Sequence, residues 1–489
     1  MVNSLIRGNK YIIAILIFGL ALRLVAINQS LWLDEAIGAL VVRDYSYAGI
    51  LNNFMRFDNH PPLYYLTLKF WTDIFGYSEV SLRFPSIIFG IATIYLAFLI
   101  ARKISNGKLK GFPEITAIIL ATSQFHIYYS QEARMYSMAA FFSSAAIYSF
   151  INTFKKDSDK WWILFSVSIT ILLFTDYAPV FLLPVFWLYG YLMKRNKIWR
   201  LKFIASHITL LIFGYFWLPT FLYQSGRGRW LLETLPGWRR VAGGATLKQA
   251  LLVWMKFVFG RLSFPRKIFY YTLVGLASAP FIISFIKLVF TKKPKYMDLI
   301  DLWLIAPLAL GFVASFWFPA FVYFRFLYVL PAFYLLVSWA ISSFTIKTIK
   351  NILVTLLVGV NLFGWVIYIS DENQQREQWR QAVLFIEKTA QINDIVIFEF
   401  TQPFAPYKWY AKNLIEAIGV TDSISADPAK TRQITAEALK DRKGIYYFEY
   451  LRELSDPKDV VQKMLSDSGY SVSKTYDYHG VGFIHYWNK

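Results

Sequence analysis

Long apolar runs recur along most of this chain, and they limit its fold more than any other feature. A run of about 20 residues is what an α-helix needs to cross the hydrocarbon core of a membrane. Only 17% of the 489 residues are charged, whereas soluble domains carry about a quarter. The pattern predicts a polytopic α-helical membrane protein with about 11 transmembrane helices. The predicted spans are 11–28, 82–101, 113–130, 133–153, 161–176, 178–193, 203–222, 267–290, 299–317, 322–343 and 350–369.

The connections between these spans indicate how the chain is oriented. A basic segment without a small-x-small cleavage site precedes the first apolar run, which predicts an uncleaved first span that enters from the cytoplasm. If the first span enters from the cytoplasm, every predicted cytoplasmic connection carries Lys or Arg, as the positive-inside rule requires. We therefore expect a multi-pass protein of a cell (inner or plasma) membrane, with a cytoplasmic N-terminus and everything after Ile369 outside. The cytoplasmic connections are 102–110, 155–160, 194–202, 291–295 and 347–350.

Two predicted external connections, 29–81 and 223–266, are long. The second is basic on the side where basic residues are not expected, which indicates either an anionic partner such as a lipid phosphate or anchoring to an acidic lipid surface. Both interpretations stay open. The apolar segments 47–55, 63–75 and 246–259 predict helices that lie along the membrane surface. Residues 1–370 are thus expected to form a membrane domain with two long external loops.

The composition changes at Asp371. Residues 371–489 hold 15 Lys+Arg against 17 Asp+Glu, so residues 1–370 carry a net charge of +22, compared with +20 for the whole chain. In a membrane portion this basic excess is a topology signal, and nucleic acid is not an expected partner. Predicted helices (371–390, 404–412, 457–468) alternate with predicted strands (394–400, 444–450) and end in a hairpin, 471–478 and 481–487. We expect one extracytoplasmic α/β domain over 371–489. The strands lack a Gly-rich phosphate loop, and the chain has no cysteine, which excludes disulfides and thiolate chemistry.

Asp34 and Glu35 stand just past the outer end of the first span. Polar groups at a membrane edge are costly to hold there, so they indicate a site. A carboxylate in this position has the chemistry of a general base that draws a proton from an acceptor hydroxyl or amine. The alternative is structural, because an acidic pair also stabilises the N-terminus of a following helix, here 36–43.

Short motifs in family order give the chain a resemblance to a known enzyme family. They are Leu33-Asp34-Glu35-Ala36, Asn59-His60-Pro61-Pro62-Leu63-Tyr64-Tyr65, Ser81-Leu82-Arg83-Phe84-Pro85-Ser86, Tyr129-Ser130-Gln131-Glu132-Ala133-Arg134-Met135-Tyr136 and, more loosely, Arg325-Phe326-Leu327-Tyr328-Val329-Leu330-Pro331. The set resembles the GT-C-fold membrane glycosyltransferases that use polyprenyl-phosphate sugars, namely the protein O-mannosyltransferase-like enzymes and the lipid A aminoarabinose transferases (glycosyltransferase family 39-like). The resemblance covers residues 31–331.

The resemblance implies roles for the motif residues. Asp34 becomes the catalytic base, with Glu35 beside it in the same pocket. His60 occupies the position of a Lys that contacts the donor phosphate in some members, and a neutral imidazole brings one hydrogen bond where Lys brings a charge. The alternatives for His60 are a bond to the acceptor or sugar, or a metal site shared with Asp58. Predicted substrate contacts are Asp58, Tyr64, Gln131 and Glu132.

Three arginines, Arg83, Arg134 and Arg325, fall near external span ends in this topology. Guanidinium groups gathered at one membrane face suit bidentate recognition of a buried phosphodiester. The alternative for each is an arginine that merely reaches out to lipid headgroups. Taken with the resemblance, the set predicts a site for the donor phosphate.

The sequence therefore predicts inverting transfer of a hexosyl or pentosyl unit from a polyprenyl-phosphate donor to an extracytoplasmic protein, lipid or glycan. Asp34 and the arginines are expected to converge on one pocket. No cofactor is required, because arginines can supply the positive charge, and no metal ligand is assigned; a divalent metal stays an alternative. A lipid-linked glycan flippase or transporter, or a non-catalytic glycan-binding homologue, is the rival, although the sequence shows no internal repeat. Membrane lipids are expected partners, and the oligomeric state is left open.

Overall fold

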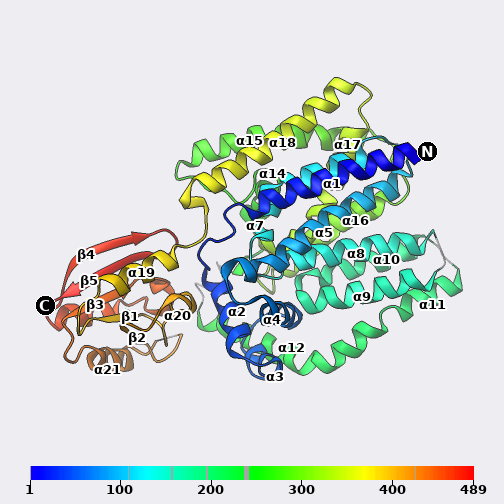
Figure 1. Ribbon diagram of the computed structural model, residues 1–489. Coiled ribbons are helices and arrows are strands. Elements are labelled where there is room, and N and C mark those ends of the chain that lie inside the picture. Colours follow the sequence, from blue (N-terminus) through cyan, green and yellow to red (C-terminus); the bar gives the residue numbers. More distant parts are fainter. Residues whose placement is uncertain (1, 108, 156–157, 194–195, 236–241, 425) are drawn as a thin grey trace. The chain divides into compact units, whose positions relative to one another are not determined.

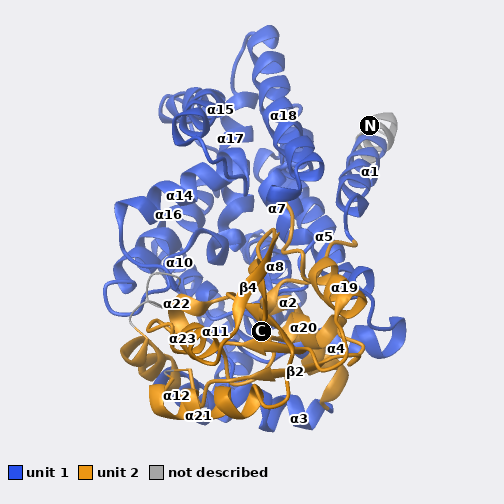
Figure 2. Ribbon diagram, turned by 90° about the vertical axis from the view of Figure 1, so that its left-hand side faces the viewer, with its two compact units in different colours: residues 1–27, 46–226, 242–374 blue, residues 28–45, 227–241, 375–489 orange. Residues whose placement is uncertain are grey.

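The computed structural model describes residues 2–107, 109–155, 158–193, 196–235, 242–424 and 426–489 (Figure 1). The chain divides into two compact units (Figure 2). The first unit holds residues 1–27, 46–226 and 242–374, and the second holds residues 28–45, 227–241 and 375–489. The second unit thus includes the segment that carries Asp34 and Glu35 as well as the C-terminal residues. Parts of the predicted connections, namely residues 108, 156–157, 194–195 and 236–241, lie outside the described residues.

The first unit is a bundle of helices. Six of its described helices are long and apolar enough to cross a membrane by length and composition. They include α5 (Glu79–Ser105), α15 (Lys267–Val289), α16 (Met297–Ala314) and α18 (Lys347–Ser370). The others are Lys197–Thr234, which contains α11 (Lys197–Ala205) and α12 (Ile208–Thr234), and Tyr323–Ser342, which contains η3 (Tyr323–Val329) and α17 (Leu330–Ser342). The remaining helices of the bundle are α1 (Val2–Leu24), α6 (Phe112–Thr122), α7 (Gln124–Ser130), α8 (Tyr136–Thr153), α9 (Asp159–Thr175), η2 (Ala178–Leu182) and α10 (Leu183–Leu192).

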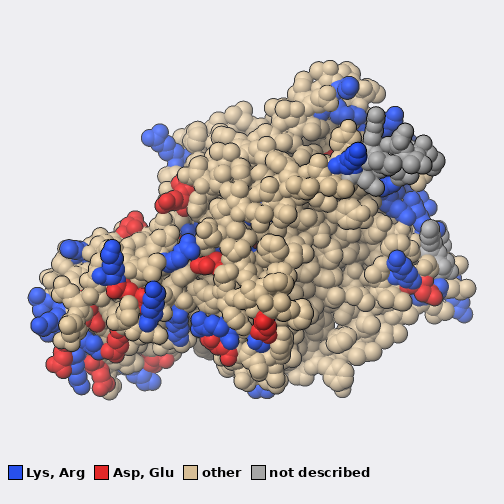
Figure 3. Space-filling model, in the orientation of Figure 1, with Lys and Arg blue, Asp and Glu red and all other residues tan. Residues whose placement is uncertain are grey.

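Large apolar side chains cover the outside of this bundle. Phe216 on α12 and Ile268 on α15 are 75% and 85% exposed, and apolar exposure on this scale marks a surface that faces lipid. Figure 3 shows the helical unit with a broad area of uncharged side chains, whereas both signs of charge cover the C-terminal residues. The chain is therefore a polytopic helical membrane protein. The number of spans and their orientation stay predictions.

Some predicted spans differ from the observed helices in continuity or length. The segment 113–130 is not one continuous helix, because the helix breaks at Ser123, whose φ of −53° and ψ of 115° are not helical. The Ser123 side chain accepts the N–H of His126 and so caps α7. The helix predicted over 203–222 extends to Thr234 as α12 (Ile208–Thr234), so the predicted connection 223–266 begins inside a helix.

The predicted surface segments form helices. The segment 63–75 is α4 (Leu63–Phe75), 246–259 is α14 (Leu247–Phe259), and 47–55 divides into α3 (Tyr47–Asn52) and η1 (Phe54–Arg56). Ser46 and Thr246 cap α3 and α14 by accepting backbone N–H groups.

Arg23 interrupts the first apolar run, and the structure gives it a buried network. Its guanidinium donates to the carbonyls of Gly19 (2.8 Å) and Ala121 (2.9 Å) and to Ser130 Oγ (3.1 Å), and it lies 2.7 Å from His126 Nδ1. Arg23 is 0% exposed, and a buried charge is tolerated only with partners of this kind. The network links α1, α6 and α7.

The second unit is built on a five-stranded sheet in the order β2-β1-β3-β5-β4. Strands β1 (Ile395–Phe398), β2 (Glu416–Gly419) and β3 (Gly444–Phe448) are parallel, and the hairpin of β4 (Ser471–Tyr478) and β5 (Gly482–Asn488) joins β3 antiparallel. Described helices of this unit include α2 (Leu33–Asp44), α19 (Trp379–Thr389), α20 (Ala405–Tyr410), α21 (Pro428–Ala438), α22 (Arg452–Ser455) and α23 (Val460–Asp467).

Alternating side chains of β1 build two cores. Val396 and Phe398 pack with α19 on one face, and Ile395 and Ile397 pack with Val461 of α23 on the other. Successive strand residues point to opposite faces, and a parallel sheet covered on both faces reads as a continuous apolar run. That explains why residues 394–400 have the pattern of a buried strand.

The N-terminal boundary of the first helix in this domain differs from the prediction. A helix was expected from Asp371, but the described chain has a 3₁₀ turn at Glu372–Gln374 and α19 begins only at Trp379. The N–H of Arg376 donates to Gln29 Oε1 and that of Gln378 to the His479 carbonyl. With these tertiary partners, residues 375–378 are not helical.

Candidate functional site

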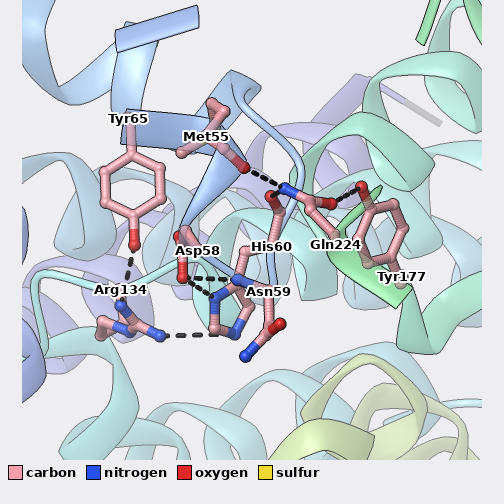
Figure 4. Close-up of polar contacts among 8 residues, drawn as sticks. All are labelled: Met55, Asp58, Asn59, His60, Tyr65, Arg134, Tyr177 and Gln224. Carbon is pink, nitrogen blue, oxygen red and sulfur yellow. Dashed lines mark hydrogen bonds and ion pairs between the residues drawn. The ribbon is translucent and has the colours of Figure 1, made fainter. Parts of the chain in front are cut away.

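The first cluster of candidate residues lies in the loop that precedes α4, and Figure 4 shows its contacts. His60 Nδ1 lies 3.0 Å from Asp58 Oδ1, and Arg134 donates to His60 Nε2 at 3.4 Å and to Tyr65 Oη at 3.2 Å. This arrangement fixes the histidine tautomer, because Nδ1 carries the proton given to Asp58 and Nε2 accepts from Arg134. The structure thus brings together His60, Asp58 and Arg134 from two separate motifs.

The electrostatics of this loop favour an ionised Asp58. Burial alone would raise the pKa of Asp58, but His60, Arg134 and the Tyr65 hydroxyl outweigh burial and lower that pKa to about 2. Asp58 is therefore a carboxylate at any physiological pH, and it holds the His60 ring in place.

The same loop is anchored by α12. Gln224 is 3% exposed and donates through Nε2 to the carbonyls of Met55 (2.7 Å) and His60 (3.1 Å). Its Oε1 accepts the hydroxyl of Tyr177 at 2.7 Å, and Tyr177 in turn accepts from the Trp217 indole. The Gln224 amide therefore uses both ends to fix the backbone beside His60 (Figure 4). Sequence reasoning missed Gln224, because the predicted span ended at residue 222 and Gln224 fell in the predicted external connection 223–266, whereas it lies in α12.

A second cluster forms around Arg261, which the sequence did not single out. Its guanidinium lies 4.5 Å from the ring centre of Tyr128, a cation–π distance. Glu132, Tyr129 and Tyr323 also act electrostatically on Arg261. Glu132 is 2% exposed. Arg261 falls in the predicted external connection 223–266, whose basic character was the sequence signal for it.

The turn that presents Arg261 requires glycine at position 260. Gly260 has a φ of +88°, and a Cβ there would lie 2.1 Å from Gln124 Oε1. That oxygen accepts the backbone N–H of Arg261 at 2.6 Å. On the other side Lys256, 7% exposed, donates to the Leu262 carbonyl at 2.6 Å. Two contacts therefore set the position of the Arg261 backbone.

The other predicted residues of the first unit have varied surroundings. Arg83 is 1% exposed and donates to the Ile27 carbonyl at 2.7 Å. The Gln131 amide donates to the carbonyls of Arg23 (2.8 Å) and Val25 (2.6 Å), so it holds the end of α1. Tyr64 is 3% exposed, and Arg325 lies half-buried in η3.

Asp34 and Glu35 stand in the first turn of α2, in the second unit. Glu35 is fully buried, whereas Asp34 is partly exposed. The expected helix 36–43 is therefore real and begins slightly earlier. The other predicted site residues belong to the first unit, so the convergence of Asp34 with the arginines stays a prediction. Among the described residues, no group of three His, Asp or Glu side chains is placed to hold a metal ion.

Comparison with known proteins identifies the architecture. Residues 59–222 match the family model described as dolichyl-phosphate-mannose-protein mannosyltransferase. An uncharacterized protein of Aquifex aeolicus (strain VF5) is 27% identical over 201 residues. That match takes in 40% of this chain and 38% of the relative, so the chain matches less than half the length of its curated relative.

Solved structures match along the whole chain. ArnT from Cupriavidus metallidurans in the apo state has a TM-score of 0.61 at 10% identity, over 100% of this chain and 98% of that one. The same protein bound to undecaprenyl phosphate has a TM-score of 0.58 at 11% identity, over 99% and 98%. Arabinofuranosyltransferase AftD from Mycobacteria has a TM-score of 0.54 at 12% identity, over 98% of this chain and 40% of AftD. The chain therefore has the GT-C fold that the sequence resemblance predicted, the fold of a group of membrane glycosyltransferases that includes ArnT and AftD.

Proposed function

We propose that this protein transfers one monosaccharide, with inversion, from a polyprenyl-phosphate donor to an acceptor outside the cytoplasm. One observation carries the proposal: a chain with the GT-C fold over its whole length holds a partly exposed carboxylate, Asp34, in the first turn of the helix that follows its first span. The bound undecaprenyl phosphate in the ArnT structure supports the class of donor. The acceptor is a protein, lipid or glycan.

In the proposed reaction Asp34 removes the proton of the acceptor hydroxyl or amine. The acceptor atom then attacks the anomeric carbon from the face opposite the phosphate, and the bond between that carbon and the phosphate oxygen breaks. The polyprenyl phosphate leaves with the electron pair of that bond. Positive groups preorganised around the leaving phosphate lower the barrier, and no nucleotide is needed.

The proposed phosphate groups are Arg134 with its partner His60, together with Arg83 and Arg325. To these we add Arg261, because its turn is fixed by the Gln124 contact and its guanidinium is held against an aromatic ring. A guanidinium with a fixed backbone loses little freedom when it binds an anion. Asp58 holds His60, and Tyr64, Gln131 and Glu132 are proposed to line the substrate site.

The central test is transfer by the purified full chain in lipid nanodiscs. Labelled undecaprenyl-phosphate sugars are supplied with an envelope extract as the source of acceptors. We expect Asp34→Asn to abolish transfer while binding of undecaprenyl phosphate persists, and Arg261→Gln to weaken that binding about tenfold. Asp44→Asn is the matched control, since Asp44 ends the same helix in an exposed ion pair with Arg43.

Unchanged transfer by the Asp34→Asn variant would remove Asp34 from the role of base. The anomeric configuration of the product, read from its NMR coupling constant, tests inversion separately. Retention of configuration would contradict the single-displacement mechanism.

A further inference from the structure

The segment that carries Asp34 is fastened to the C-terminal domain within the second unit. The N–H of Leu31 donates to Tyr410 Oη at 2.8 Å, and the Ser30 hydroxyl accepts the N–H of Arg380 at 3.0 Å. Leu33 packs against the core cluster around Trp379. The residues that lead into α2 are thus set by contacts with residues of 375–489.

Glu377 is the side chain of this domain that reaches the start of α2. Its carboxylate accepts the Trp379 indole N–H at 2.7 Å and lies 3.3 and 3.4 Å from the Tyr450 hydroxyl. It also interacts with the backbone of Leu33. The N-cap residue of α2, Trp32, supplies no capping side chain, and the first N–H groups of a helix need acceptors. Glu377 therefore caps α2 from outside the helix.

The β4–β5 turn leaves room for this side chain. Gly480 has a φ of +75°, and a Cβ at that position would lie 2.5 Å from Glu377 Cγ. The neighbouring His479 exchanges hydrogen bonds with Gln378, through its carbonyl at 2.8 Å and its N–H at 3.0 Å. The turn thus holds the backbone beside Glu377 and admits its side chain only because residue 480 is glycine.

Asp34, in the same first turn as Leu33, acts electrostatically on both Glu377 and Tyr450. We propose that Glu377 is a positioning residue for Asp34: it fixes the turn that presents Asp34 and sets the charge beside this proposed base. The C-terminal domain would then contribute to the reaction centre by positioning Asp34. This inference rests on the proposed function.

The charge on Glu377 changes near neutral pH. Burial raises the pKa of Glu377, the Trp379 and Tyr450 hydrogen bonds oppose that rise, and Asp34 adds to it, with a net pKa of about 7. Asp34 on α2 and Tyr450 beyond β3 are titratable groups that act on Glu377. The pKa of Tyr450 is raised well above its usual value, chiefly by burial and then by Glu377, so Tyr450 stays a neutral hydrogen-bond donor.

The direction in which turnover should change with pH follows from the ionisation of Glu377. When Glu377 ionises as the pH rises through about 7, its carboxylate becomes a stronger acceptor for the Leu33 N–H and holds the first turn of α2, with Asp34, more firmly. Turnover should therefore rise with pH across this range. Glu377→Gln keeps an oxygen for the Leu33 N–H but can never carry the charge. We expect it to lower kcat about tenfold at pH 8, to leave the KM for the donor unchanged, and to remove the pH dependence.

The test compares full-length wild type, Glu377→Gln and Glu387→Gln in nanodiscs between pH 5.5 and 8.5. Glu387 lies on α19, in the same unit, and also accepts a backbone N–H, from Lys412, so it controls for loss of a hydrogen-bonded carboxylate elsewhere in that unit. Wild-type pH dependence and turnover in Glu377→Gln would overturn the inference. If Glu377→Gln lowers kcat but keeps the wild-type pH profile, Glu377 caps α2 structurally and its charge plays no part, which overturns the charge-dependent role.

A second measurement does not depend on activity. Infrared spectroscopy follows the protonated carboxyl band of Glu377, assigned by its disappearance in Glu377→Gln. Because Asp34 raises the pKa of Glu377, Asp34→Asn should move this titration to lower pH. An unmoved titration overturns the pairing, whereas a wild type without any glycosyl transfer overturns the proposed function instead.

Discussion

The two units differ in how fully their ionisable side chains are paired with hydrogen-bonding or charged partners. In the helical unit Arg23 is surrounded by carbonyl and hydroxyl acceptors, and Asp58 is paired with His60 beside Arg134. In the C-terminal domain Glu399, directly after β1, is 0% exposed; Tyr447 and Asp456 act on it, but within the described residues neither carboxylate oxygen makes a hydrogen bond of good geometry. Burial without full pairing favours the neutral acid. Such a group should make the stability of its domain depend on pH.

Burial raises the pKa of Glu399 to about 9 from an ordinary 4.5. Between these values the folded domain keeps a proton that the unfolded chain has released, so stability falls as pH rises, by up to about 1.4 kcal/mol per pH unit. We expect Glu399→Gln to remove this slope and to raise stability at pH 8. Urea pulse proteolysis of the full chain, following fragments from residues 375–489, measures it. The exposed Glu416→Gln is the control, and a retained slope in Glu399→Gln would contradict the prediction.

At the level of elements, close helix crossings depend on small residues. Gly90 on α5 faces Ser130 of α7, and a Cβ at Gly90 would lie 2.3 Å from Ser130 Oγ. That hydroxyl accepts from Arg23 Nε at 3.1 Å and donates to the His126 carbonyl at 2.6 Å. The crossing therefore has no space for a methyl group, and the buried Arg23 network depends on it.

Gly90→Ala should destabilise the bundle, because overpacking a filled contact typically costs about 1–3 kcal/mol. Gly275→Ala is the matched control, since Gly275 lies in helix α15 with nothing within 4 Å of its added Cβ. There, replacing glycine in a helix should be neutral or slightly stabilising. Thermal unfolding of both variants in detergent, followed by tryptophan fluorescence, compares them. Equal melting temperatures for the two variants would show that α5 and α7 can move apart without loss of stability.

At the level of the whole molecule, the proposed reaction requires the C-terminal domain to lie outside the cytoplasm. The bundle has apolar helices of sufficient length to cross a membrane. The positive-inside rule predicts its orientation from the Lys- and Arg-bearing connections. Orientation can be tested directly because the chain has no cysteine of its own.

A single cysteine placed at Asp467, exposed at the end of α23, should react with a membrane-impermeant maleimide in intact cells. Lys197→Cys, exposed at the start of α11 in a predicted cytoplasmic connection, should react only after permeabilisation. The unaltered chain is the unreactive control. Labelling of Lys197→Cys alone in intact cells would reverse the topology and place the C-terminal domain in the cytoplasm.

Local patterns in the sequence predicted the elements whose formation is governed locally. Helix α4 begins and ends where its amphipathic segment does, and the hairpin of β4 and β5 follows its alternating residues. Strand β2 (Glu416–Gly419) was missed, because its short, partly polar segment becomes a strand only by pairing with β1. Helix α21 was missed as well; its residues are mostly polar, and its start depends on the Asp427 cap.

The sequence by itself determined a helical membrane protein with a C-terminal α/β domain and the positions of the motif residues, because hydrophobic period and length act over neighbouring residues. Only the tertiary structure decided which distant side chains meet. It placed Arg261 against Tyr128, Gln224 under the His60 loop and Glu377 at the start of the Asp34 helix. These pairs are far apart in the chain, and no local pattern encodes them: each is created when packing buries polar groups that then require partners.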